Sequence, residues 1–127
     1  MQTSGTEPRD RLRFRLDEIV IDSLDPRSLA RFWSDLLGYD IVDEDEDILG
    51  IEDPEAVAPS ICFQKVSEGK LAKNRLHFDL DVGEGMFEDA IAKVLNLGGR
   101  RVDVGQPRRS SWVVMADPEG NEFCVIG

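Results

Sequence analysis

The chain has 127 residues, of which 41% are hydrophobic and 32% are charged. It is apolar enough to bury one core and too short to build two independent ones. Fifteen Lys and Arg residues stand against 26 Asp and Glu residues, giving a net charge of −11. This acidity disfavours nucleic-acid and membrane partners, because phosphate backbones and anionic lipids are repelled.

The number of cysteines and the length of the apolar runs indicate the cellular location. Only two cysteines are present, Cys62 and Cys124, which is too few for a disulfide framework. No apolar run approaches the roughly 20 residues that cross a bilayer, and the first residues lack an apolar signal segment. We therefore expect a cytoplasmic protein with reduced thiols.

The first strand region shows a change of pattern. Residues 1–12 are polar and predict a flexible N-terminal arm, followed by a single domain over residues 13–127. Apolar side chains then recur every second residue, at Leu12, Phe14, Leu16, Ile19 and Ile21. The change from even to odd numbers predicts a bend, a bulge, or an arm strand joined to the true first strand.

A well-marked helix follows this strand. Asp25 and Pro26 favour a helix start, because the carboxylate accepts free amide hydrogens and proline needs no partner at the first position. Gly38 favours the left-handed closing position. One apolar stripe runs between them, through Leu29, Phe32, Trp33, Leu36 and Leu37. We expect Trp33 to pack in the core rather than to contact a ligand.

The pattern of the rest of the first half predicts three short strands, over residues 39–43, 48–52 and 60–66. The first two are separated by five adjacent acidic residues, 43–47, which predict a solvated turn rather than a calcium loop because like charges repel. In the third strand, Ile61 and Phe63 share one face, and Cys62 and Gln64 share the other.

The second half repeats this order. Residues 76–82 predict a strand whose polar face carries His77, Asp79 and Asp81. A helix begins near Phe87 and ends at two glycines, 98 and 99. Three short strands follow, over residues 101–104, 112–116 and 122–126. An arginine pair, Arg108 and Arg109, lies in the loop between the first two of them and could contact a carboxylate.

The two halves are related by an offset of about 60 residues, which superimposes Gly38 on Gly98 and Phe63 on Phe123. Each half is a βαβββ unit, over about 13–67 and 74–127. Because one helix covers only one face of such a sheet, the other face stays open. We therefore predict an α+β fold in which tandem βαβββ modules form a curved mixed sheet around a cup, with the helices outside.

Three segments resemble the vicinal oxygen chelate superfamily of glyoxalases, bleomycin-resistance proteins and extradiol dioxygenases, especially its small glyoxalase-like domains. They are LDPRSLARFWSDLLGYDIV (24–42), NRLHFDLDV (74–82) and ADPEGNEFCVIG (116–127). The resemblance implies tandem modules around a metal or ligand cup, and it implies a homodimer.

The resemblance also implies metal positions on the first and last strand of each module. The matching residues are Glu18, Gln64, His77 and Cys124, with Glu122 facing the same way as Cys124. Only His77 is the usual residue in its usual place. Zn²⁺ accepts nitrogen, carboxylate and thiolate ligands, so Glu18, His77, Glu122 and Cys124 are the candidate metal ligands, while a single histidine poorly suits Fe, Mn or Ni centres.

Three functions are consistent with these residues. We predict a small organic ligand in the cup, bound without the complete metal set and with no required cofactor; the alternative is a metal-dependent lyase, isomerase or dioxygenase acting on vicinal oxygens. A base such as His77 could also act without a metal. Candidate catalytic residues are Glu18, His77 and Glu122. Candidate ligand-binding residues are Glu18, Val20, Cys62, Gln64, His77, Asp79, Trp112 and Cys124.

Overall fold

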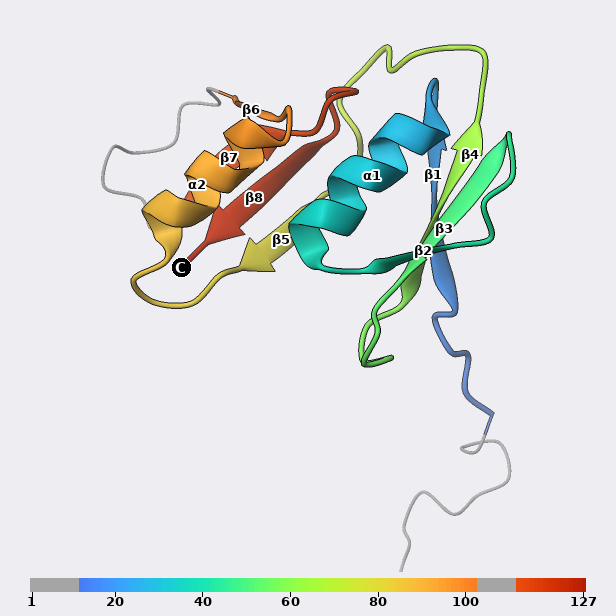
Figure 1. Ribbon diagram of the computed structural model, residues 1–127, viewed down its shortest axis with the longest axis horizontal. Helices are drawn as coiled ribbons and strands as arrows, with labels where there is room; N and C mark the ends of the chain where they lie inside the picture. Colours follow the sequence, from blue (N-terminus) through green and yellow to red (C-terminus); the bar gives the residue numbers. More distant parts are fainter. Residues whose placement is uncertain (1–11, 103–111) are drawn as a thin grey trace, which may run out of the picture.

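A computed structural model describes residues 12–102 and 112–127 of the protein. Two helices and two four-stranded sheets make up this part of the chain (Figure 1). The first module contains β1 (Glu18–Ser23), α1 (Pro26–Leu37), β2 (Asp40–Val42), β3 (Ile48–Glu52) and β4 (Ser60–Lys65). The second contains β5 (Phe78–Asp81), α2 (Phe87–Asn96), β6 (Arg100–Arg101), β7 (Trp112–Ala116) and β8 (Glu122–Ile126).

The two sheets have the same strand order. It is β1-β4-β3-β2 in one and β5-β8-β7-β6 in the other, and the first strand of each module runs parallel to its last. This repeated arrangement confirms the predicted α+β fold of tandem βαβββ modules. No helix in residues 12–102 or 112–127 is long and apolar enough to span a membrane.

The first helix has the predicted boundaries. The Asp25 side chain accepts a hydrogen bond from the Ser28 amide at 3.3 Å, and Pro26 takes the first helical position. Gly38 closes the helix with a φ of 74°, a left-handed conformation that costs glycine little. The acidic segment 43–47 is exposed, as expected of a solvated turn.

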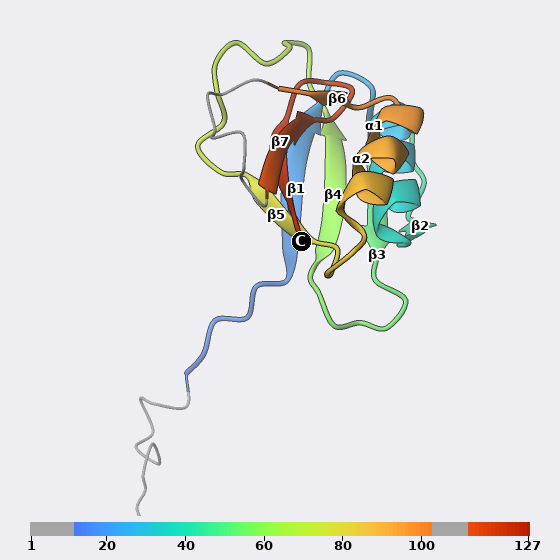
Figure 2. The same cartoon turned by 90° about the vertical axis from the view of Figure 1, so that its left-hand side faces the viewer.

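Both helices lie on the same side of the sheets (Figure 2). Under them lies one hydrophobic core, because residues of both modules belong to a single packed cluster. Trp33 of α1 is only 2% exposed, as predicted, and its ring lies 4.9 Å from that of Phe123 and 5.6 Å from that of Phe78. The first helix thus packs against the second module.

Several strand boundaries differ from the sequence prediction. β5 begins at Phe78 instead of residue 76, and β6 covers only Arg100 and Arg101. Residues 12–17 form no ladder and leave the domain as an extended segment, although their alternation is typical of a strand (Figures 1 and 2). Residues 1–11 of the predicted arm, and Arg108 and Arg109, lie outside the described residues.

Candidate functional site

The two modules are joined through the turn between β7 and β8, residues 117–121. Asp117 is fully buried, and one of its carboxylate oxygens accepts a hydrogen bond from the Trp33 indole nitrogen at 3.0 Å. The other oxygen accepts the amides of Glu119 and Asn121, both at 2.9 Å. Because buried carboxylates are costly unless hydrogen-bonded, these contacts hold the turn and α1 in one geometry.

Glu119 makes a second contact across the junction. Its carboxylate accepts hydrogen bonds from the Ser23 hydroxyl at 2.6 Å and from the amides of Leu24 and Asp25 at 2.9 and 3.1 Å. These donors lie between β1 and α1, so a side chain of the second module accepts the hydrogen bonds of the residues that lead into the first helix. A negative charge is also favoured at a helix N-terminus. The carboxylate therefore fixes the relative position of β1 and the 117–121 turn.

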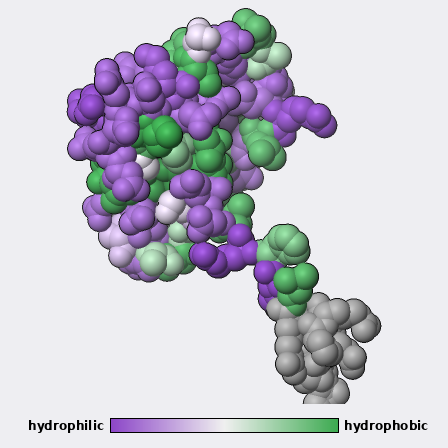
Figure 3. Space-filling model, turned by 90° about the vertical axis from the view of Figure 1, so that its right-hand side faces the viewer, coloured by the Kyte–Doolittle hydropathy of each residue, from purple (hydrophilic) through white to green (hydrophobic). Residues whose placement is uncertain are grey.

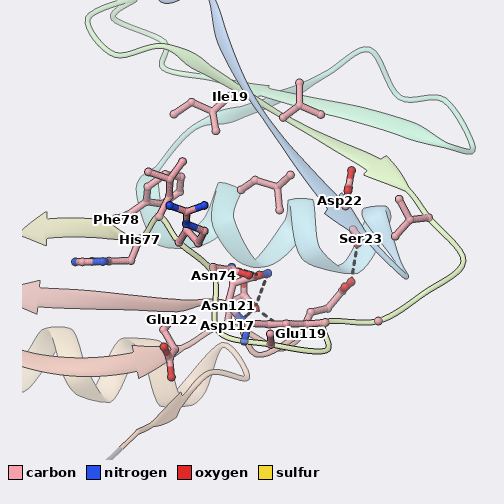
Figure 4. A pocket seen from close by; sticks show the side chains of 18 of the residues that line it. Ile19, Asp22, Ser23, Asn74, His77, Phe78, Asp117, Glu119, Asn121 and Glu122 are labelled. Carbon is pink, nitrogen blue, oxygen red and sulfur yellow. Dashed lines mark hydrogen bonds between the residues drawn. The ribbon is translucent and has the colours of Figure 1, made fainter. Parts of the chain in front are cut away.

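Between these contacts lies a cavity of about 660 Å³, the junction cavity (Figure 4). Both modules line it. Its apolar lining includes Ile19, Ile21, Trp33 and Phe78, and its polar lining includes Asp22, Asn74, Arg75, His77 and Asn121. Asn74, in the linker between the modules, donates a hydrogen bond to the Asn121 side-chain oxygen at 2.8 Å. The cavity combines an apolar surface with several directional polar groups, which is typical of a small-molecule site.

His77 lies at the edge of the junction cavity and also lines a second cavity of about 440 Å³, the sheet cavity. The sheet cavity lies over the second module and is lined by Trp112, Val114, Cys124 and Ile126, with Lys73, Asp79 and Glu122 also on its wall. The second cavity therefore contains five residues predicted for the site: His77, Asp79, Trp112, Glu122 and Cys124.

His77, Asp79 and Cys124 form a compact group on this sheet. The His77 Nε2 atom lies 3.1 Å from Asp79 Oδ1. Asp79 pairs with Cys124 in the β5–β8 ladder, and one ligand atom of each of the three residues lies within 4.8 Å of the other two. It is the only group of three or more such residues within residues 12–102 and 112–127.

The donor chemistry of this group fits a borderline divalent cation. An imidazole nitrogen, a carboxylate oxygen and a thiolate are accepted together by Zn²⁺, whereas the thiolate suits Mn²⁺ poorly. Burial, and then the neighbouring Asp79 carboxylate, raise the pKa of the Cys124 thiol. A proton must therefore leave that thiol before it can act as a metal ligand.

Glu122 lies beside the group but outside it. Its carboxylate accepts a hydrogen bond from the Lys73 ammonium at 2.9 Å. That contact, together with the positive charge of Lys73, lowers the pKa of Glu122. The residue is therefore held as a carboxylate at neutral pH, and the lowered pKa makes it a weaker proton acceptor than a glutamate without this partner.

Three of the predicted site residues lie elsewhere. Glu18, Cys62 and Gln64 line neither cavity among the described residues. Burial, followed by the charges of Glu18 and Asp43, raises the pKa of Cys62, so these groups form a separate acidic region on the first sheet. Val20, by contrast, lines the junction cavity. Cys62 and Cys124 are both free thiols.

The strand register explains why Glu18 is apart from His77. Asp22 pairs with Gln64 in the first module, and Asp79 pairs with Cys124 in the second. Since Gln64 and Cys124 occupy matching places in the repeat, Asp22 corresponds to Asp79, and Val20, two residues earlier, corresponds to His77. The first module therefore has an apolar side chain where the second has its histidine.

Sequence reasoning missed the functional part of the junction. The predicted site residues did not include Asp117, Glu119, Asn74 or Arg75. The Asp-Pro-Glu sequence that begins this turn also follows β3 in the first half, at residues 53–55, so it indicated a turn and not the contact of Asp117 with Trp33. For Glu119 no local signal existed, because its partners lie about 95 residues away in sequence.

Comparison with known families decides the affiliation. A family model described as a glyoxalase-like domain matches residues 18–126, almost the whole chain. The protein belongs to the glyoxalase-like domain family. The resemblance to the vicinal oxygen chelate superfamily, inferred from residues 24–42, 74–82 and 116–127, is thereby confirmed. A search of curated protein sequences found no match.

Solved structures share the fold of this glyoxalase-like protein at low sequence identity. A glyoxalase/bleomycin resistance protein/dioxygenase family enzyme from Burkholderia phytofirmans is 16% identical, with a TM-score of 0.66 over 87% of this chain and 95% of that chain. The fosfomycin resistance protein FosX from Mesorhizobium loti is 13% identical, with a TM-score of 0.70 over 91% and 94%.

A variant of FosX from Listeria monocytogenes, whose structure contains Mn(II) and a dihydroxypropylphosphonic acid, is 11% identical, with a TM-score of 0.72 over 91% of this chain and 90% of that chain. At these identities the similarity establishes the fold of the glyoxalase-like protein, and function must be argued from its own site.

Proposed function

We propose that this glyoxalase-like protein binds a small organic molecule in the junction cavity. The observation that supports the proposal is the size and lining of that cavity. Its volume of about 660 Å³ falls within the roughly 300–1,000 Å³ of small-molecule pockets. Both modules contribute to it, and the Trp33–Asp117 and Glu119 contacts hold its walls in place.

The lining indicates the character of the ligand. Ile19, Ile21 and Phe78 supply apolar surface, and the linker supplies Asn74 and Arg75. An apolar or aromatic body would contact these apolar side chains, while the side chains of the linker would orient a polar substituent. His77, at the edge, is a candidate polar contact or general base for the same ligand.

An aromatic anion provides a direct test. We would titrate 8-anilinonaphthalene-1-sulfonate and follow its fluorescence with the wild-type protein, with Val20→Phe, which adds volume inside the cavity, and with Val57→Phe, at an 81% exposed site on a loop. We expect Val20→Phe to weaken binding about tenfold, a change of about 1.4 kcal/mol, and Val57→Phe to leave it unchanged. Equal affinity for all three proteins would refute the proposal.

A second candidate function is metal-dependent lyase, isomerase or dioxygenase chemistry on a substrate with vicinal oxygens. The observation that favours it is the group of His77, Asp79 and Cys124. These residues would hold the ion, which would polarise the substrate oxygens as a Lewis acid. Glu122, kept as a carboxylate beside Lys73, would accept the substrate proton.

Cobalt binding tests this second candidate without a substrate. A cysteine ligand gives Co²⁺ a thiolate charge-transfer absorption, so the spectrum reports Cys124 directly. We expect the absorption in the wild-type protein and in Cys62→Ser, and its loss in Cys124→Ser and His77→Ala. Absorption that survives Cys124→Ser, or that never appears at stoichiometric Co²⁺, would exclude a metal held by this group.

A further inference from the structure

The linker between the modules, residues 66–76, is basic although the chain as a whole is acidic. It contains three basic residues and one acidic residue, whereas the rest of the chain contains 12 basic and 25 acidic ones. Hydrophilic side chains cover most of the face of the molecule shown in Figure 3, in line with the net charge of −11. Most of the linker residues line the junction cavity. A basic segment beside a cavity raises the local concentration of anionic ligands.

Three of the acidic side chains that line this cavity already have partners. Asp117 and Glu119 accept the hydrogen bonds that join the two modules. Glu122 accepts a hydrogen bond from Lys73 at 2.9 Å, and this bond, with the positive charges of Lys73 and Lys70, lowers the pKa of Glu122. The two lysines of the linker therefore balance a negative charge of the protein itself.

Arg75 is the basic residue of the linker that remains. It is exposed and lines the junction cavity, and it forms no ion pair within residues 12–102 and 112–127. The adjacent Asn74 donates a hydrogen bond to the Asn121 side chain at 2.8 Å, which holds the chain beside the arginine. A guanidinium presents several N–H groups in one plane and matches the two oxygens of a carboxylate.

Asp22 and Glu68, the other acidic residues of the cavity, belong to its opposite end. Glu68 lies in the first part of the linker, which leaves β4 beside the end of β1. Figure 4 shows Asp22 near that end of the cavity and His77 near the other, and Arg75 is close to His77 in the chain. The charges in the cavity are thus divided, with acidic groups where the linker begins and a basic group where it ends.

We propose that the ligand of the junction cavity carries an acidic group, a carboxylate or a similar oxyanion, on an apolar body, and that Arg75 determines this specificity by binding the acidic group. The apolar body would lie against Ile19, Ile21 and Phe78. The inference rests on the proposed binding of a small molecule in this cavity, and it adds the charge of that molecule. Because Arg75 is exposed, the preference for an anion should decrease as the salt concentration rises.

Two dyes that share one apolar body separate the effect of charge from that of shape. The dye 8-anilinonaphthalene-1-sulfonate is an anion, and N-phenyl-1-naphthylamine has the same rings without the sulfonate. We would titrate both dyes, and follow their fluorescence, with the wild-type protein, Arg75→Gln and Arg75→Lys. The matched control is Arg31→Gln, which removes the same charge from an exposed position of α1 outside the cavity.

The expected result differs between the two dyes. Arg75→Gln should weaken binding of the anionic dye about tenfold, the lower end of what a hydrogen bond to a charged group contributes, and should leave binding of the neutral dye unchanged. Arg75→Lys keeps the charge without the planar guanidinium, so it should weaken binding of the anion less. Arg31→Gln should leave the binding of both dyes unchanged.

The cavity variant Val20→Phe separates failure of this inference from failure of the proposed function. If Val20→Phe weakens binding of the neutral dye while Arg75→Gln leaves binding of the anion unchanged, the cavity binds ligands and the inference about charge is wrong. The inference is also wrong if Arg31→Gln weakens binding of the anion as much as Arg75→Gln does, because net charge then explains the effect. If Val20→Phe affects neither dye, or if the wild-type protein binds neither, the proposed function and the inference are both overturned.

Discussion

The buried hydrogen bond between Trp33 and Asp117 makes the stability of the protein sensitive to one atom. In Asp117→Asn, the amide oxygen would keep the place that accepts the Glu119 and Asn121 amides, because two backbone donors point there. The new NH₂ group would then face two donors, because the Trp33 indole N–H and the Asn121 side-chain NH₂ lie 3.0 and 2.9 Å from the oxygen it replaces. A donor would thus meet a donor in a fully buried place.

The expected cost follows from two losses. A hydrogen bond to a charged group contributes about 1.5–3 kcal/mol, and a buried donor left without a partner costs about 1–3 kcal/mol. We expect Asp117→Asn to lower the free energy of unfolding by about 3 kcal/mol. With an unfolding entropy of about 2.1 cal/mol/K per residue, the melting temperature would fall by about 10 °C.

A double-mutant cycle isolates the contact. Trp33→Phe removes the indole donor and keeps an aromatic ring, so Asp117→Asn should cost about 1.5 kcal/mol less in that background. Urea denaturation of the four proteins gives the coupling energy, and Trp112→Phe serves as the matched tryptophan control. If the two changes add within about 0.5 kcal/mol, or if Asp117→Asn alone costs less than 1 kcal/mol, this account of the junction is wrong.

Three further predictions concern single residues. Asp25→Ala should lower the free energy of unfolding by about 1 kcal/mol. Hydrogen bonds from Ser28 lower the pKa of Asp25, so the stabilisation by this carboxylate is present above pH 3.8 and is lost as the pH falls further, which urea titrations at several pH values would measure. Gly99→Ala should lower the melting temperature, since its Cβ would lie 2.8 Å from the Ala116 carbonyl oxygen. Cys124 should react with iodoacetamide more slowly than free cysteine at pH 7, and faster as pH rises, because burial raises its pKa; equal rates would contradict this.

Local signals in the sequence predicted the fold well. Asp25, Pro26 and Gly38 determine both ends of α1 through capping and backbone freedom, which depend only on neighbouring residues. The matching order of the two halves predicted the paired sheets. These features are local or repeated, so no knowledge of distant contacts was needed to find them.

The composition of the site was less accessible from sequence. Alternation showed that His77, Asp79 and Cys124 share a face, but their grouping apart from Glu18 depends on the registers of two separate ladders. The contact of Trp33 with Asp117 joins residues 84 positions apart. A helix stripe identified Trp33 as a core residue but could not show that its indole nitrogen meets a carboxylate of the other module.

The junction between the modules has a consequence for how the chain can be assembled. Within residues 12–102 and 112–127 no strand ladder joins the two sheets, so side-chain contacts and the exposed segment 67–75 connect them. A backbone break in that segment would leave both ladders intact. Two polypeptides, one that ends in this segment and one that starts in it, should therefore assemble when co-expressed. Trp33 of one and Asp117 of the other would form the contact between them.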